Sequence, residues 1–136
     1  MPQPGISNIK QAVTTYLDIR GVVNQVLVTL ADSTRDGGLN GGANATKLFP
    51  GMVVCRVGGT GADAGKYTHF DLSEANYQDE QNCGVLMDVI DDISTGDQQA
   101  HVAFGGGAIF KRSQLRFYEA ADKSGFNYAE FPVDTI

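Results

Sequence analysis

The sequence predicts a mainly β fold: a small β-sandwich or barrel with an N-terminal arm and little helix. Glycine is unusually frequent, with 17 Gly against 4 Pro in 136 residues, and Gly-rich chains with many short apolar runs tend to be all-β. From Leu48 onward, short apolar runs follow one another closely. Turn residues separate them at intervals of about 8–12 residues, a spacing typical of a sandwich or barrel.

Residues 1–20 are expected to form an arm ahead of a single β-rich domain at 21–136, because a chain of this length usually makes one domain. Pro2, Pro4 and Gly5 favour an extended start. The next apolar residues fall near helical spacing, although the β-branched Thr14 and Thr15 disfavour a helix. The arm is therefore a short helix or an extended segment. Its apolar positions are Ile6, Ile9, Val13, Tyr16 and Leu17.

Residues 22–31 are predicted to form the first strand of the body. Val26 and Leu30 share one face of it, and Val23 and Leu27 share the other. A strand that is apolar on both faces is expected to be central in its sheet or covered by a neighbour.

A long loop is expected at residues 32–46, where four Gly occur among Asn, Asp and Ser. Such a composition leaves little to bury. Loops of this length in compact domains are usually functional or disordered.

The rest of the body is expected to consist of short strands joined by turns, because side-chain character alternates with a period of two. The predicted strands are 51–58, 66–72, 84–93, 99–104, 108–111 and 115–120. Aromatic residues at strand spacing are expected in the core or at an interface. They are Tyr67, Phe70, Phe104, Phe110, Phe117 and Tyr118.

The C-terminal segment 124–136 combines large apolar residues with small and polar ones, which indicates a tail that docks. The sequence leaves open whether it docks on its own domain or on a neighbouring subunit. Its candidate docking residues are Phe126, Tyr128, Phe131 and Val133, followed by Ile136.

The net charge of −6, with ten scattered Lys and Arg residues, argues against nucleic acid or an anionic membrane surface as partner. No apolar run reaches the roughly 18 residues that a membrane span needs. The start of the chain lacks the basic and apolar regions of a secretory signal.

The Gly-rich segment 59–66 matches neither common nucleotide-binding motif. For a phosphate-binding loop, Gly59 lies one residue too early and Tyr67 stands where the motif has Ser or Thr. For a dinucleotide fingerprint, Ala64 replaces the third Gly. A turn is therefore expected here.

No set of reactive residues predicts catalysis, a metal or a cofactor. His69 and His101 stand alone on the polar faces of their strands and are expected at the surface, exposed or hydrogen-bonded. A nucleophile elbow is absent. Four acidic residues could hold calcium, but their spacing does not match an EF-hand loop, so solvated turn carboxylates are expected. They are Asp88, Asp91, Asp92 and Asp97. The sequence predicts a protein that is not an enzyme.

Cys55 and Cys83 form no CxxC motif and have no His nearby, so zinc and thioredoxin-like sites lack support. Reduced thiols in a protein of cytosolic origin are expected. A single disulfide stays open as the alternative.

The order of strand and turn signals from Pro50 to Leu115 resembles the lambda-type bacteriophage head decoration proteins, over about half the chain. An apolar strand entry follows a Gly/Ala/Thr-rich linker, and a polar segment leads into a Gly-Val-Leu strand. The chain departs from the family by its additional strand at 22–31 and its long tail after Leu115. The matching segments are 50–54, 65–67, 82–86, 91–92, 95–97, 100–104 and 106–108.

The resemblance implies a capsid cement protein that is made in the bacterial host cytoplasm and binds the outside of the expanded head. It implies a homotrimer at three-fold and quasi-three-fold sites that clamps neighbouring copies of the major capsid protein. In the family an N-terminal arm contacts the capsid lattice, and by position this is residues 2–20 here.

Two other functions stay open as alternatives. The chain could be another β-rich virion component, a tail-tube or head–tail joining protein, in which residues 32–46 would contact the next ring. It could also be a small ligand-binding β-module in which Tyr67, Tyr77 and Tyr118 stack on a sugar, although the chain has no Trp.

Overall fold

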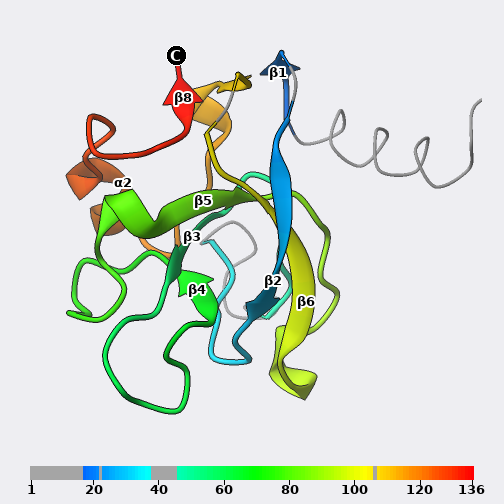
Figure 1. The fold of residues 1–136 in the computed structure, drawn as a ribbon, viewed down its shortest axis with the longest axis vertical. Helices are drawn as coiled ribbons and strands as arrows, with labels where there is room; N and C mark the ends of the chain where they lie inside the picture. The colour runs from blue at the N-terminus through cyan, green and yellow to red at the C-terminus, as the bar shows by residue number, and fades with distance from the viewer. Residues whose placement is uncertain (1–16, 22, 38–45, 106) are drawn as a thin grey trace, which may run out of the picture.

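The computed structural model of the protein describes residues 17–21, 23–37, 46–105 and 107–136. It confirms the predicted mainly β class. Five strands close into a barrel, and three shorter strands form a separate sheet (Figure 1). Within the described ranges, the α-helical element is the short α2 (Ala120–Gly125).

The barrel strands are neighbours in the order β2, β4, β3, β5 and β6, and β6 returns to β2. All junctions are antiparallel except that between β2 and β4, which is parallel and has one residue pair, Leu30 with Tyr67. The strands are β2 (Gln25–Leu30), β3 (Val53–Arg56), β4 (Tyr67–His69), β5 (Cys83–Leu86) and β6 (Gln98–Ala103).

The second sheet brings the two ends of the described chain together. Its central strand β7 (Ile109–Phe110) lies between β1 (Ile19–Arg20), which is antiparallel to it, and β8 (Asp134–Thr135), which is parallel. Strands of two residues have too little pairing to be stable alone, so packing against the barrel must hold this sheet in place. The described residues also contain the 3₁₀ turns η2 (Glu80–Asn82), η3 (Ile93–Thr95) and η4 (Arg112–Gln114).

Strand β3 contributes to two hydrophobic cores, because alternate side chains of a strand point to opposite faces. Met52, just before β3, and Val54 lie in the barrel interior with Leu86 of β5. Val53 and Cys55 lie in a second cluster outside the barrel wall. That outer cluster also contains Phe70, Phe110, Phe117, Phe126, Phe131 and Val133. The wall made by β3 and β5 is therefore covered on both sides.

The predicted strands between residues 51 and 111 each overlap an observed strand, but the prediction at 115–120 is wrong. Arg116 forms an isolated bridge with Met52, and α2 then begins at Ala120. The cause is local: Asp122 accepts a hydrogen bond from the backbone N–H of Glu119, part of a capping box that starts the helix.

Strand β2 lies between β6 and β4 in the barrel, but its side chains are less buried than expected for residues 22–31. Val26 is 55% exposed and Leu27 is 50% exposed, and only Leu30 of the strand is fully buried. The apolar pattern thus identified the strand correctly but not its surroundings.

The C-terminal segment packs on its own domain. Phe126, Phe131 and Val133 are buried in the outer cluster, and Tyr128 packs against it. The rings of Tyr128 and Phe131 each lie 5.0 Å from that of Phe126, in edge-to-face arrangements that are favourable for aromatic pairs.

The predicted arm and loop are only partly within the described ranges. Leu17 is 3% exposed and belongs to the outer cluster, so in this conformation it is a core residue. Ile6, Ile9, Val13 and Tyr16 lie outside the described residues. Of the loop predicted at 32–46, residues 38–45 also lie outside the described residues. Thr34 and Asp36 are buried, although the composition of the loop predicted little burial.

Gly84→Ala should destabilise the barrel by about 1–3 kcal/mol through overpacking. A Cβ at Gly84 would lie 2.7 Å from the carbonyl oxygen of Ala103 and 2.5 Å from Cγ1 of Val102, and the backbone oxygen cannot rotate away. Urea unfolding measures the effect, with Gly61→Ala as the matched control because a Cβ there meets nothing within 4 Å. Equal stability of the two variants would contradict the packing described.

Candidate functional site at the barrel seam

The weakest junction of the barrel, between β2 and β4, is completed by the chain that follows β2. The backbone N–H of Ala31 donates to the carbonyl of Tyr67 at 2.8 Å. The Thr34 hydroxyl then donates to the Thr68 hydroxyl at 3.1 Å, and the backbone N–H of Arg35 donates to Nδ1 of His69 at 2.9 Å. Residues 31–35 thus run beside β4 and extend the single-pair junction.

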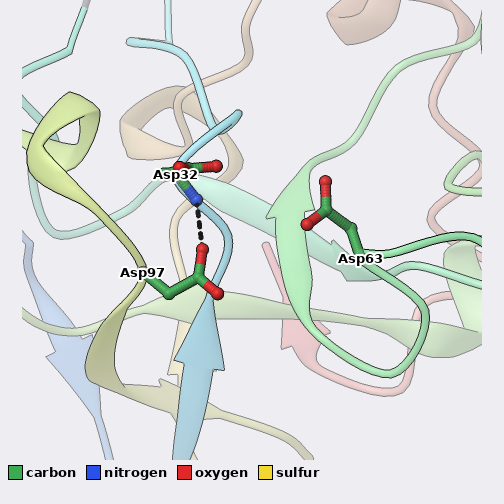
Figure 2. A group of neighbouring side chains, drawn as sticks. All are labelled: Asp32, Asp63 and Asp97. Atoms are coloured by element: carbon green, nitrogen blue, oxygen red, sulfur yellow. Dashed lines mark hydrogen bonds between the residues drawn. The ribbon is translucent and has the colours of Figure 1, made fainter.

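Three carboxylates gather at one end of this seam: Asp32 after β2, Asp63 in the turn before β4, and Asp97 just before β6 (Figure 2). Their nearest oxygens all lie within 4.8 Å of one another. Asp97 accepts a hydrogen bond from the backbone N–H of Asp32 at 2.9 Å. Oxygen atoms at this separation are a possible ligand set for a hard cation.

Lys66 already supplies positive charge to this cluster. Its Nζ lies 2.6 Å from Oδ2 of Asp97 and 3.4 Å from Oδ1 of Asp63. The hydrogen bond between Lys66 and Asp97 lowers the pKa of the Asp97 carboxyl and raises that of the Lys66 ammonium. We therefore assign these residues to closure of the barrel, because they connect the ends of three barrel segments.

The structure does not bring together the four acidic residues that the sequence singled out. Asp97 belongs to the seam, whereas Asp88 accepts hydrogen bonds from His101, and Asp92 accepts one from the backbone N–H of Ser94 at the start of η3. Asp91 lies 3.9 Å from Lys47 at the surface. The partners of Asp97, Asp32 and Asp63, are 65 and 34 positions away along the chain, so spacing alone could not reveal the cluster.

Lys66→Met should lower the stability of the fold, because it leaves the carboxylates of Asp63 and Asp97 close together without a cation. The loss should shrink at high salt, which screens charges at exposed sites. Urea midpoints at low and high salt measure it. Lys47→Met is the control, since Lys47 has one acidic partner at 3.9 Å. Equal losses in both variants would contradict the role assigned to Lys66.

His69 is buried, so the expectation that it lies at the surface is wrong. It is 5% exposed, and its ring lies 4.4 Å from that of Tyr118 and 5.7 Å from that of Tyr77. Because Nδ1 accepts the Arg35 N–H, the neutral ring carries its proton on Nε2. That nitrogen lies 3.8 Å from Oδ2 of Asp71.

Burial lowers the pKa of His69 to about 4, a net value that includes an opposing effect of Asp71 and a small further lowering by the nearby Arg35. The histidine is thus held neutral as a hydrogen-bond acceptor in the seam. His101, in contrast, lies at the surface with 38% of its side chain exposed, and Nδ1 is 3.0 Å from Asp88. This agrees with the expected hydrogen-bonded surface position.

The fold should lose stability as the pH falls from 6.5 to about 4 because of His69. Unfolded His69 takes up a proton near 6.5, whereas the folded state resists protonation until about 4. The unfolded state therefore binds more protons in this window, at a cost to stability of about 3 kcal/mol.

Urea unfolding across this pH range tests the assignment. Carboxylates also titrate there, so the informative quantity is the difference between wild type and His69→Gln, which keeps an acceptor but cannot titrate. The variant should show the smaller pH dependence. If the free energy of unfolding depended on pH equally in the two proteins, the role assigned to His69 would be contradicted.

Cys55 and Cys83 are directly opposite each other on β3 and β5, and both thiols are free and buried. Each thiol donates to the carbonyl of Asp79, at 3.2 Å from Cys55 and 3.4 Å from Cys83. Burial raises the pKa of the Cys83 thiol. Since the thiolate is the reactive form, these cysteines have the surroundings of packing residues.

The tyrosines considered for sugar binding do not form one platform. Tyr77 and Tyr118 flank His69, whereas Tyr67 packs edge-on against Phe104 at 5.6 Å. A pocket of about 200 Å³ lies elsewhere, between the residues after β7 and the start of α2. This is below the usual size of small-molecule sites. The residues that line it are Gly37, Leu115, Arg116, Phe117, Glu119, Ala120 and Lys123.

Comparison with known proteins identifies no relative of this chain. No protein-family model, curated protein or solved structure matches the chain. Among the described residues, no helix has the length and apolar character to cross a membrane.

Proposed function

We propose that this chain is a capsid decoration protein of a tailed bacteriophage, which binds the outside of the expanded head as a trimer and clamps neighbouring capsid subunits. The observation that carries the proposal is the order of strand and turn signals from Pro50 to Leu115, which resembles the decoration family. This segment contains strands β3 to β7.

The surroundings of the reactive side chains support a binding role over catalysis. His69 and Lys66 take part in the barrel seam, and Cys55 and Cys83 lie in a hydrophobic core. His101 contacts Asp88. A general base or nucleophile must reach a substrate, whereas each of these groups has its contacts within the chain.

A decoration role also requires no reactive side chains, because the protein acts by binding. An arm that adds a strand to a partner's exposed sheet edge gains main-chain hydrogen bonds with little need for a particular sequence. Ordering such an arm costs about 1–2 kcal/mol of backbone entropy per residue, which burial of its apolar residues must offset. Three arms on one trimer act together, so each contact can be weak.

Deletion of residues 2–16 should leave the fold intact and abolish capsid binding. The deletion stops before Leu17 because Leu17 is buried and β1, at Ile19–Arg20, pairs with β7; a longer deletion would damage the second sheet. Co-sedimentation with expanded, undecorated capsids of the phage that encodes the chain measures binding, and urea unfolding checks the fold.

The matched control keeps the arm at full length with Ile6→Ser and Ile9→Ser, which should weaken binding less than the deletion. Undiminished co-sedimentation of the deleted protein would overturn the role of the arm. Failure of the full chain to bind expanded capsids would overturn the decoration function. Assembly of the full chain into rings or tubes would instead favour a tail-tube or joining protein.

A further inference from the structure

Cys55 of β3 and Cys83 of β5 are directly opposite each other in the barrel wall. The backbone of β3 shows which kind of pair they form. The carbonyl of Val53 and the N–H of Val57, two positions to either side of Cys55, both form hydrogen bonds with residues that flank β4. Alternation therefore directs the backbone groups of Cys55 toward β4 as well. The two cysteines thus form a pair without backbone hydrogen bonds between them.

This kind of pair brings side chains close enough for a disulfide. In antiparallel strands, opposite residues without backbone hydrogen bonds have Cα atoms about 4.5 Å apart. A disulfide spans Cα separations of about 4.4–6.8 Å, so the backbone needs little movement. Directly opposite side chains also point to the same face of the sheet, and here both lie in the outer cluster.

The sulfur atoms are already neighbours in the reduced protein. Both thiols donate to the carbonyl of Asp79, at 3.2 Å from Sγ of Cys55 and 3.4 Å from Sγ of Cys83. Burial, and then a hydrogen bond with the Cys55 thiol, raise the pKa of the Cys83 thiol. The Asp79 carbonyl also accepts from the backbone N–H of Asn82 at 2.9 Å, so it keeps a donor when the sulfur atoms turn toward each other.

We propose that Cys55 and Cys83 are an oxidation site at which a peroxide forms an intramolecular disulfide across the barrel wall. The bond joins β3 to β5, the two strands whose opposite faces serve both hydrophobic cores. It also closes the loop that contains β4. Such a crosslink stabilises a fold mainly by restricting the unfolded chain. The inference goes beyond the proposed function and does not depend on capsid binding.

The reaction consumes one peroxide molecule for each disulfide. The thiolate of one cysteine attacks a peroxide oxygen and breaks the O–O bond, which gives a sulfenic acid and releases hydroxide. The thiolate of the other cysteine attacks that sulfur, so that the S–S bond forms, the S–O bond breaks and a second hydroxide leaves. The hydroxides take up the protons of the two thiols and become water. Both thiols are thus oxidised and the peroxide is reduced.

Burial makes this reaction slow while the barrel is closed. Both cysteines are fully buried, and the raised pKa of Cys83 disfavours the thiolate, which is the nucleophile. Hydrogen peroxide is small, so a local opening is enough to admit it. The turn η2 follows the Asp79 carbonyl that both thiols contact, and it contains no buried residue. We expect the opening there, because segments with little burial open most easily.

The test exposes the full chain, reduced and then freed of reductant, to hydrogen peroxide under native conditions. Alkylation after unfolding counts the remaining thiols, and peptide mapping without reductant identifies the linked peptides. Wild type should lose both thiols to a bond between Cys55 and Cys83, faster in urea below the unfolding transition. Oxidation should lower the equilibrium constant for unfolding by about 100-fold, and a reductant applied to the unfolded chain should reverse the change.

Cys83→Ser is the matched control, because its hydroxyl can still donate to the Asp79 carbonyl but cannot form a disulfide. Peroxide should give this variant no gain in stability. The comparison of oxidised with reduced wild type needs no variant, so the test holds even if Cys83→Ser does not fold. An intramolecular bond that stabilises wild type would support the inference. Thiols that remain free, sulfinic acid without a disulfide, a bond between two chains, or a bond that lowers stability would each overturn it.

Discussion

The fold depends on the burial of β3 and β5 from both sides. Each strand directs alternate side chains into the barrel and into the outer cluster, so one wall serves two cores. Residues of the second sheet and the C-terminal aromatic residues pack against the outer side of that wall. Because strands of two residues are too short to be stable alone, the small sheet depends on its packing against the barrel.

The barrel itself closes at a junction that hydrogen bonding between strands barely supports. Strands β2 and β4 share the single pair Leu30 and Tyr67. Polar groups from residues 31–35, together with Lys66 and its acidic partners, connect the two sides. The neutral imidazole of His69 belongs to this seam as a hydrogen-bond acceptor for the Arg35 N–H, which gives this buried titratable residue a structural role.

Strand β2 shows what an apolar sequence pattern can predict and what it cannot. Its alternation was sufficient to predict a strand, and its apolar content on both faces predicted a strand that is central in its sheet or covered by a neighbour. The barrel uses the inward face near Leu30 and leaves Val26 and Leu27 exposed. The pattern therefore predicted the strand, whereas the folded barrel decided how much of it is buried.

The sequence by itself determined the β class, the approximate positions of most strands and the turns between them, because period-two patterns and Gly-rich turns are local signals. It could not predict the strand order, the burial of His69 or the gathering of Asp32, Asp63 and Asp97. Those features were decided by the tertiary structure, since they depend on which strands become neighbours and in what register. The tertiary structure also decided where Phe126 and Phe131 pack. An apolar tail can bind any exposed apolar surface, and only the folded barrel presents the outer face of β3 and β5 to this tail.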